Sequence, residues 1–273
     1  MTFNTEGSEF IKLIDLNQVL EKGTQHMRVV GIIQARMGST RLPGKILHEI
    51  AGTPMLARVV ERLARSSTLE SVLIATTTRS ADDPVASLCR NSGFAFYRGN
   101  EMDVLDRYYQ AAREAKADAV VRITADCPLI DPGVVDLVVG TFLENPTELD
   151  YACNFLPKRS FPRGLDTEVL HFSTLETTWR EAVDPHFREH VTLFIYRHPE
   201  RFRIRGLCHS EDLSKLRWTV DTPDDMAFVR TIYEHFGDDR FDWNDVLAVL
   251  HERPEWAQIN AHIDQKALPT VST

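Results

Sequence analysis

Residues 29–45 read VVGIIQARMGSTRLPGK, an apolar run that leads into a loop of small and cationic residues. The run from Val29 to Ile33 predicts a buried strand. The loop contains two glycines, a serine and a threonine, together with the cations Arg36, Arg41 and Lys45. Glycine lets backbone N–H groups approach phosphate oxygens, and the cations neutralise phosphate charge. The stretch therefore predicts a strand that ends in a cradle for a nucleoside triphosphate.

The spacing of this loop differs from two familiar phosphate-binding motifs. A Walker A loop has the form G-x-x-x-x-G-K-[ST], whereas here five residues separate Gly38 from Gly44, and Ile46 follows Lys45. The G-x-G-x-x-G of dinucleotide-binding folds is also absent. The alternative is a solvated surface loop after an edge strand. Three cations in so short a segment of an acidic chain argue against that alternative.

The composition narrows the class of partner. The chain has 273 residues, 43% of them hydrophobic, with a formal net charge of -9 and a pI near 5.6. Proteins that bind nucleic acid or anionic membranes are usually basic, so a small-molecule or protein partner is favoured. No apolar run approaches the length of a membrane span, and residues 1–27 lack the apolar core of a secretion signal. We therefore expect a cytoplasmic protein that binds neither nucleic acid nor membrane.

Strand and helix patterns alternate through the first half of the chain. This alternation predicts an α/β fold with a mostly parallel central sheet, Rossmann-like, and helices on both faces. From about residue 147 the pattern changes, which predicts a small α+β insertion over about 147–210. The predicted strands are 29–35, 71–76, 94–97, 119–124, 150–154, 164–170, 201–207 and 216–220, and the later predicted helices are 173–183, 186–197, 224–236 and 243–252.

The predicted domain organisation has three parts. Residues 28–255 form the main domain, flanked by an N-terminal extension, 1–27, and a C-terminal tail, 256–273. The extension has two open explanations. Either Met27 is the natural start and the preceding residues come from an upstream start codon, or the extension packs on the surface or on a second subunit.

Two aspartates follow predicted strands directly. Ligands of open α/β sheets bind outside the carboxyl ends of the strands, and Asp126 and Asp221 both lie at such positions. Mg²⁺ is usually held by one or two carboxylates, with phosphates and water completing its shell. The alternative for Asp221 is a helix N-cap, although Thr222 before Pro223 already fits that position. The alternative for Asp126 is a turn-forming aspartate.

These motifs together resemble those of the CMP-sugar synthetases, or cytidylyltransferases. The resemblance covers about residues 28–235 and is greatest to the spore coat polysaccharide biosynthesis protein F-like group, which is related to the 3-deoxy-manno-octulosonate and acylneuraminate cytidylyltransferases. It implies a fold of the nucleotide-diphospho-sugar transferase type and Mg²⁺ as cofactor. The implied reaction transfers CMP from CTP to a sugar or sugar acid with release of pyrophosphate, for surface polysaccharide synthesis. Relatives often dimerise through the insertion, which implies a possible homodimer.

The resemblance also implies roles for individual residues. Asp126 and Asp221 would bind the metal. At the position of Gln34, many relatives have proline instead. Several of these residues have an alternative explanation. Asp103 and Arg107 fit an i,i+4 helix pair equally well. The alternative for His190 is a structural histidine, and the alternative for Glu168 is an exposed charge. The implied catalytic residues are Arg36, Arg41, Lys45 and Asp126; the implied nucleotide-binding residues are Gln34, Ala35, Arg36, Gly38, Ser39, Arg41, Lys45, Ala75, Thr76, Asp103 and Arg107; and the implied acceptor-binding residues are Arg163, Glu168 and His190.

Two other functions stay open at this point. A glycosyltransferase of related fold would use a nucleotide-sugar, but such enzymes commonly carry a D-x-D metal motif, and none is present in the sequence. A non-catalytic nucleotide-binding protein would be expected to lack the metal carboxylates, and both are present. The residues leave the identity of the sugar, the strictness of the CTP preference and the oligomeric state undetermined.

Overall fold

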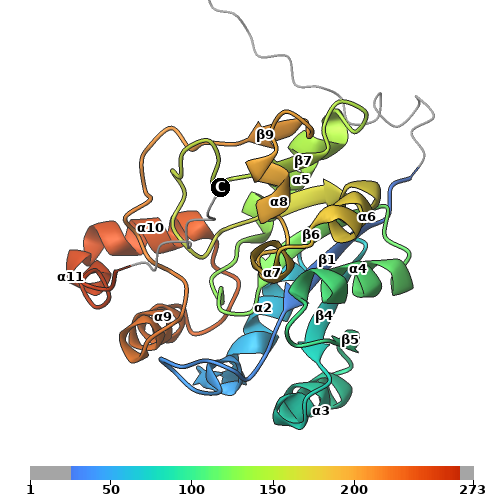
Figure 1. Cartoon of the computed structure of the whole chain (residues 1–273). Coiled ribbons are helices and arrows are strands. Elements are labelled where there is room, and N and C mark those ends of the chain that lie inside the picture. Colours follow the sequence, from blue (N-terminus) through green and yellow to red (C-terminus); the bar gives the residue numbers. More distant parts are fainter. Residues whose placement is uncertain (1–25, 265–273) are drawn as a thin grey trace, which may run out of the picture.

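The computed structural model describes residues 26–264, so most of the predicted extension (1–27) and the end of the predicted tail (256–273) lie outside the described residues. Figure 1 shows a central sheet with helices on both sides. The order of the strands is β5-β4-β1-β6-β8-β7-β9. Their bounds are β1 Val29–Gln34, β4 Ser71–Thr77, β5 Phe96–Gly99, β6 Ala119–Thr124, β7 Tyr151–Cys153, β8 Glu168–His171 and β9 Ile204–Gly206.

Strand directions confirm the predicted mostly parallel sheet. β1, β4, β5 and β6 are mutually parallel. β8 is antiparallel to both of its neighbours, and β7 and β9 are parallel. A separate hairpin joins β2 (Glu49–Ile50) to β3 (Thr53–Pro54). The carboxyl ends of β1 and β6 therefore lie side by side at one edge of the sheet. The loop of residues 36–45, which we call the phosphate-loop candidate, starts at this edge, and Asp126 lies there too.

Helices cover the two faces because the central strands are apolar on both. In β1, Ile33 and Ile32 point to opposite faces, and both are fully buried. One core packs α2, α3, α5, α9 and α10 against one face, and a second core packs α4, α6 and α8 against the other. The helix bounds are α2 Met55–Leu63, α3 Asp83–Ser92, α4 Val104–Glu114, α5 Pro132–Glu144, α6 Phe172–Glu181, α7 Pro185–Glu189, α8 Leu193–Arg197, α9 Pro223–Phe236, α10 Trp243–Glu252 and α11 Pro254–Ala257, with the 3-10 turns η1 Lys45–Leu47 and η2 Ser80–Asp82.

The predicted strand at 216–220 is wrong. Its backbone makes only an isolated bridge, between Arg163 and Arg217, and Val220 N–H donates to the carbonyl of Asp126 at 2.8 Å. Arg217, Trp218 and Val220 are buried, while Leu216 and Thr219 are partly exposed. The segment is therefore an extended connection that joins two loops, and its apolar pattern reflects burial rather than membership of the sheet.

Two other predicted elements are shorter than expected. The strand predicted over 164–170 begins only at Glu168, because Gly164 has a φ of 107° and lies against the backbone of Trp218. The helix predicted over 186–197 is divided into α7 and α8 at Val191, which has a φ of 22°. A β-branched residue at positive φ interrupts a right-handed helix. This break places the residues just before it, including His190, in a connecting turn.

Asp136 fastens α5 to the loop that precedes β4. Its carboxylate accepts hydrogen bonds from the hydroxyls and backbone N–H groups of Ser67 and Thr68, and from the hydroxyl of Ser66. Burial raises the pKa of Asp136, but these hydrogen bonds outweigh it and hold the pKa below the ordinary 3.8. A carboxyl whose pKa is lower in the folded state stabilises the fold above its unfolded pKa, and the contribution fades as pH falls through the folded pKa.

We expect Asp136→Asn to lower the free energy of unfolding at neutral pH by about 1–3 kcal/mol, because hydrogen bonds to a charged acceptor are lost. The difference from wild type should narrow as pH falls below 3.8. Urea denaturation over a pH series measures both effects, with the exposed Asp238→Asn as the control. A difference that is constant with pH would show that the charge of Asp136 has no part in it.

Candidate active site

The phosphate-loop candidate begins where β1 ends and is fixed at both of its own ends. Ala35 N–H donates to the carbonyl of Ala75 at 3.1 Å. Met37 N–H donates to the carboxylate of Asp82 at 2.6 Å, which ties the loop to η2. Gly44, with a φ of 66°, caps the 3-10 turn that starts at Lys45. This left-handed residue turns the chain so that the Lys45 side chain points back toward the sheet edge.

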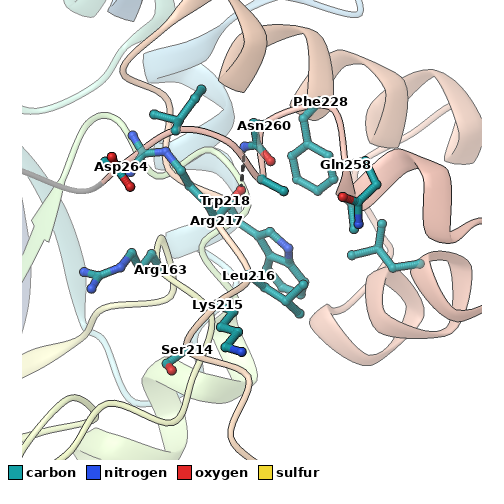
Figure 2. A pocket seen from close by; sticks show the side chains of 14 residues that line it. Arg163, Ser214, Lys215, Leu216, Arg217, Trp218, Phe228, Gln258, Asn260 and Asp264 are labelled. Atoms are coloured by element: carbon teal, nitrogen blue, oxygen red, sulfur yellow. Dashed lines mark hydrogen bonds between the residues drawn. The ribbon is translucent and has the colours of Figure 1, made fainter.

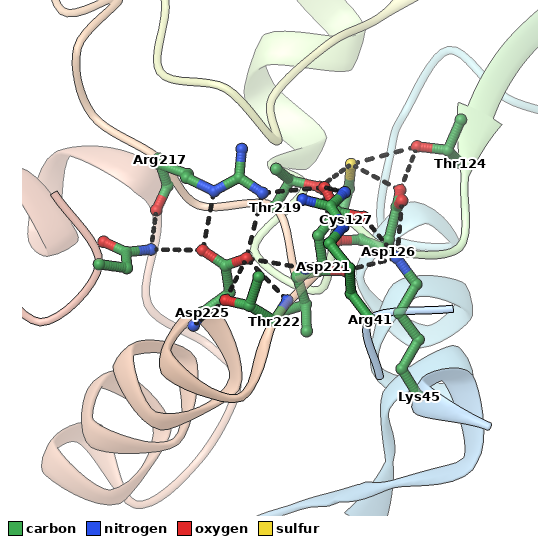
Figure 3. Close-up of polar contacts among 12 residues, drawn as sticks. Arg41, Lys45, Thr124, Asp126, Cys127, Arg217, Thr219, Asp221, Thr222 and Asp225 are labelled. Atoms are coloured by element: carbon green, nitrogen blue, oxygen red, sulfur yellow. Dashed lines mark hydrogen bonds and ion pairs between the residues drawn. The ribbon is translucent and has the colours of Figure 1, made fainter. Parts of the chain in front are cut away.

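Lys45 bridges the two aspartates predicted at the ends of strands. Its Nζ lies 3.1 Å from Oδ2 of Asp126 and 2.9 Å from Oδ1 of Asp221, and it donates a third hydrogen bond to the carbonyl of Val220 at 2.6 Å (Figure 3). Burial lowers the pKa of Lys45, but the two carboxylates outweigh that effect and raise it. The amine is therefore a firmly protonated cation held between two anions.

Asp126 directly follows β6. Thr124 donates its hydroxyl proton to Oδ1 of Asp126 at 2.6 Å. The carbonyl of Asp126 accepts from Val220 N–H and from the hydroxyl of Thr219. These bonds hold the segment that leads to Asp221 against the end of β6. The segment 216–220 is not a strand, but it still places Asp221 at the edge of the sheet.

Asp221 lies between two arginines and the start of α9. Arg41 and Arg217 contact its Oδ2 at 3.0 and 2.8 Å. Burial raises the pKa of Asp221, but Lys45, Arg217 and Arg41 outweigh it, so the pKa lies below its usual range. Thr222 caps α9 with Pro223 in the first turn, as predicted, which leaves the side chain of Asp221 available for these ion pairs.

A second carboxylate, Asp225, also binds Arg217. It is fully buried and accepts from Arg217 Nε at 2.8 Å, from the backbone of Asp221 and Thr222, and from Asn260. Arg217 is thereby oriented toward Asp221, and its Nη2 contacts Oδ2 of both Asp221 and Asp225, at 2.8 and 3.1 Å (Figure 3). The pair forms a rigid support behind Asp221.

The phosphate-loop candidate and the two aspartates line one cavity of about 310 Å³. Of the predicted nucleotide-binding and metal residues, the structure brings these together there: Gln34, Arg36, Gly38, Ser39, Arg41, Lys45, Asp126 and Asp221. Residues separated by most of the chain therefore converge at the carboxyl edge of the sheet. The cationic loop and the paired carboxylates of this cavity suit a metal-bound polyphosphate.

A smaller cavity of about 120 Å³ adjoins the first, because Gln34 and Arg36 line both. It is also lined by Ala35, Val104, Arg107, Arg122, Glu189 and His190. Arg107 is fully buried and donates to the carbonyl of Asn100 at 2.6 Å. Burial lowers the pKa of His190, which keeps its imidazole neutral over a wider pH range. Three arginines around so small a volume favour an anionic group.

Five predicted site residues, Ala75, Thr76, Asp103, Glu168 and Arg163, lie outside these two cavities. Ala75 and Thr76 are buried within β4, between β1 and β5. Asp103 caps α4, and its carboxylate accepts three hydrogen bonds from Arg188 at 2.6–3.0 Å, so it does not form the alternative pair with Arg107. Glu168 is buried, not exposed, and is bonded by Arg122 at 2.5 Å and by Tyr151 at 2.8 Å.

Arg163 lines a different cavity, of about 420 Å³, beside Trp218 and Asn260 (Figure 2). Burial, followed by the neighbouring Arg159, lowers the pKa of Arg163. Among the described residues, the predicted acceptor set is therefore divided. His190 lines the small cavity, Glu168 contacts it only through Arg122, and Arg163 lies apart.

Sequence reasoning missed two arginines. Arg122 occupies the middle of the otherwise apolar β6, bonds Glu168, and contacts the side chain of Gln34 at 3.2 Å. A charge inside a buried strand is rare enough to have drawn attention. Arg217 stands four residues before Asp221, but its pairing with Asp225 depends on the turn at Thr222, which local pattern does not reveal.

Comparisons with known proteins agree with this geometry. A family model described as cytidylyltransferase matches residues 30–241. The spore coat polysaccharide biosynthesis protein SpsF of Bacillus subtilis is 30% identical, over 84% of this chain and 96% of that protein. A 3-deoxy-manno-octulosonate cytidylyltransferase of Geobacter sulfurreducens is 31% identical, over 83% of this chain and 99% of that protein. The solved structure of a cytidylyltransferase from Leptospira borgpetersenii is similar with a TM-score of 0.82 and 36% identity, covering 85% of this chain and 98% of that one.

Proposed function

This chain belongs to the cytidylyltransferase family, and on that premise we propose that it transfers CMP from CTP to a sugar acid, with release of pyrophosphate, in the synthesis of a surface glycan. The observation that carries the proposal is the convergence of Arg41 and Lys45 with Asp126 and Asp221 in one cavity. The names of the relatives support the substrate class, because one acts on 3-deoxy-manno-octulosonate and another serves in spore coat polysaccharide synthesis. The use of CTP would place the enzyme in the cytoplasm.

The phosphate-loop residues would carry most of the charge stabilisation. Arg36, Arg41 and Lys45 line the 310 Å³ cavity together with Gly38 and Ser39. Arginine forks bind phosphate oxygens in two places, and lysine acts as a compact point charge. In nucleotidyl transfer the acceptor hydroxyl attacks the α-phosphorus while the bond to the β,γ-pyrophosphate breaks. Cations at the triphosphate end would stabilise the negative charge that accumulates on the leaving pyrophosphate.

Asp126 and Asp221 fit a hard divalent cation. Their carboxylates are close enough for one ammonium nitrogen to contact both, at 3.1 and 2.9 Å. Residues 26–264 contain no group of three or more His, Cys, Asp or Glu side chains that could hold a metal by themselves. Two carboxylates completed by phosphate oxygens and water suit Mg²⁺. Bound there, the ion would neutralise phosphate charge, while Asp126 and Asp221 would orient it.

The small cavity would take the acidic end of the acceptor. Arg107, which is buried, and Arg122, which is partly buried, present guanidinium groups there, beside the neutral His190. We propose that Glu168 positions Arg122 through their 2.5 Å contact, and that Arg122 and His190 meet the sugar acid. A carboxylate gains two parallel hydrogen bonds from a guanidinium, which a neutral sugar does not. Arg163 stands outside this proposed acceptor site.

Pyrophosphate release from CTP tests the proposal. The purified full chain is incubated with Mg²⁺, each of the four nucleoside triphosphates, and a panel of sugar acids and neutral sugars. We expect release with CTP and one or more sugar acids, no release after chelation, and recovery when Mg²⁺ is restored. Consumption of a nucleotide-sugar without CTP turnover would support a glycosyltransferase instead. No turnover with any pair would contradict the proposed function.

Arg41→Ala should lower kcat/KM for CTP by about a hundredfold, the usual cost of removing one donor that stabilises developing charge. Arg41 lies at the mouth of the cavity and contacts Asp221 rather than the core, so the variant should fold. The exposed Arg240→Ala serves as the control and should retain full activity. Wild-type rates with Arg41→Ala would remove this residue from the proposed triphosphate site.

A further inference from the structure

Lys45 makes every contact that an ammonium group can make. Its three N–H bonds go to Asp126, Asp221 and the carbonyl of Val220, at 2.6–3.1 Å. None of these partners is expected to leave, because each belongs to the framework of the sheet edge. Within the described residues, the amine of Lys45 therefore lies between the same two carboxylates that the proposed function assigns to the metal.

The carboxylate oxygens are equally engaged. Oδ1 of Asp126 accepts from Thr124, and its Oδ2 accepts from Lys45. Oδ1 of Asp221 accepts from Lys45, and its Oδ2 contacts both Arg41 and Arg217. A divalent cation needs lone pairs from these same oxygens. To bind here, it must first displace at least the ammonium group.

Charge balance opposes that displacement when no nucleotide is present. The cluster holds three cations, Lys45, Arg41 and Arg217, and three anions, Asp126, Asp221 and Asp225, each in contact with an opposite charge. A bare divalent ion would expel the buried ammonium group of Lys45, and the remaining anion of the cluster, Asp225, is already paired with Arg217. Separating a buried ion from its partners is strongly unfavourable.

A nucleotide changes this balance. Its phosphates would enter the cavity that Ser39, Arg41 and Lys45 already line, and they bring anionic oxygens that Lys45 can contact instead of the carboxylates. The lysine side chain is a flexible stem with a point charge, so its amine can change partners with small movements of the chain. The carboxylates are then released for the metal.

We propose that Lys45 is the resident cation of the metal site: it occupies the place between Asp126 and Asp221 until nucleotide draws it onto the phosphates, so that metal and nucleotide bind with positive coupling. This inference rests on the proposed function for the identity of the nucleotide. It goes beyond that function because it assigns to Lys45 the exclusion of free metal and not only the binding of phosphate. By linkage, metal must favour nucleotide as much as nucleotide favours metal.

Manganese binding to the nucleotide-free protein tests the proposal. Electron paramagnetic resonance of free Mn²⁺ gives its affinity for the wild-type chain and for Lys45→Gln. We expect the variant to bind Mn²⁺ more tightly than wild type by about tenfold or more, within the usual range of coupling between sites. Lys158→Gln is the matched control, because Lys158 also pairs with an aspartate, Asp212 at 2.9 Å, but on an exposed loop. It should leave Mn²⁺ affinity unchanged.

A measurement on wild type alone makes the proposal testable even if the variant does not fold. Mn²⁺ is titrated into the protein with and without saturating CTP, in the absence of acceptor, and binding to CTP itself is subtracted. We expect affinity about tenfold or more higher with CTP. Equal affinities, or a Lys45→Gln variant no tighter than wild type, would overturn the proposal. A failure of CTP turnover would instead contradict the proposed function and leave the nucleotide-free comparison valid.

Discussion

Asp126→Asn should lower kcat/KM for CTP-dependent pyrophosphate release by about 10²- to 10³-fold, the largest effect on activity that we expect. The substitution keeps the size of the side chain and removes the charge that faces Lys45 at 3.1 Å. A neutral amide is a weaker ligand for Mg²⁺ than a carboxylate, so the proposed metal would lose one of its two anionic protein ligands. Steady-state kinetics with CTP and an active sugar acid measure the loss.

The control for this variant is Asp212→Asn. Asp212 also pairs with a lysine, Lys158, but both side chains are exposed and neither lines the cavity. It should retain wild-type activity. Thermal unfolding of both variants separates lost chemistry from lost structure, because Asp126 is only partly buried. Full activity of Asp126→Asn would remove the proposed metal site from the reaction.

Asp225→Ala should cost about 3–5 kcal/mol of unfolding free energy, the largest effect on stability that we expect. The carboxylate is fully buried, and its loss removes the bonds that it accepts from Nε and Nη2 of the buried Arg217, at 2.8 and 3.1 Å. It also removes the acceptor for the backbone N–H groups of Asp221 and Thr222 at the start of α9. Urea denaturation at neutral pH measures the change.

Asp224→Ala is the matched control, because Asp224 is the preceding residue of the same helix but is exposed. Its loss should cost less than about 1 kcal/mol, the range for an exposed charge near a helix N-terminus. Equal effects of the two substitutions would show that a negative charge near the start of α9, and not the buried pair with Arg217, accounts for the loss at Asp225.

Much of the fold could be predicted from local pattern. Continuous apolar runs such as Val29 to Ile33 indicate strands with both faces covered, and their alternation with helical segments indicates a parallel sheet. The rule that ligands bind at the carboxyl ends of strands then directs attention to the loop after β1 and to Asp126. The structure agrees, because β1 and β6 are adjacent and parallel.

Long-range contacts decided the segment 216–220, which reads as an apolar strand but whose backbone hydrogen bonds go to loops at Asp126 and Arg163. The contact of Asp103 also depends on the tertiary structure, because its carboxylate is bonded by Arg188, 85 residues away in sequence. Its role in nucleotide binding stays a prediction. Neither partner can be identified from spacing along the chain.

The amino-acid sequence by itself determined the alternation of strands and helices in the first half, the phosphate-loop candidate and the two acidic positions, because these depend on residue type and on regular period. Only the tertiary structure decided which charges meet. Lys45 and Asp221 are 176 positions apart, and their contact exists because separate segments are packed against one sheet edge. Ion pairs depend on distance in space, and packing sets that distance.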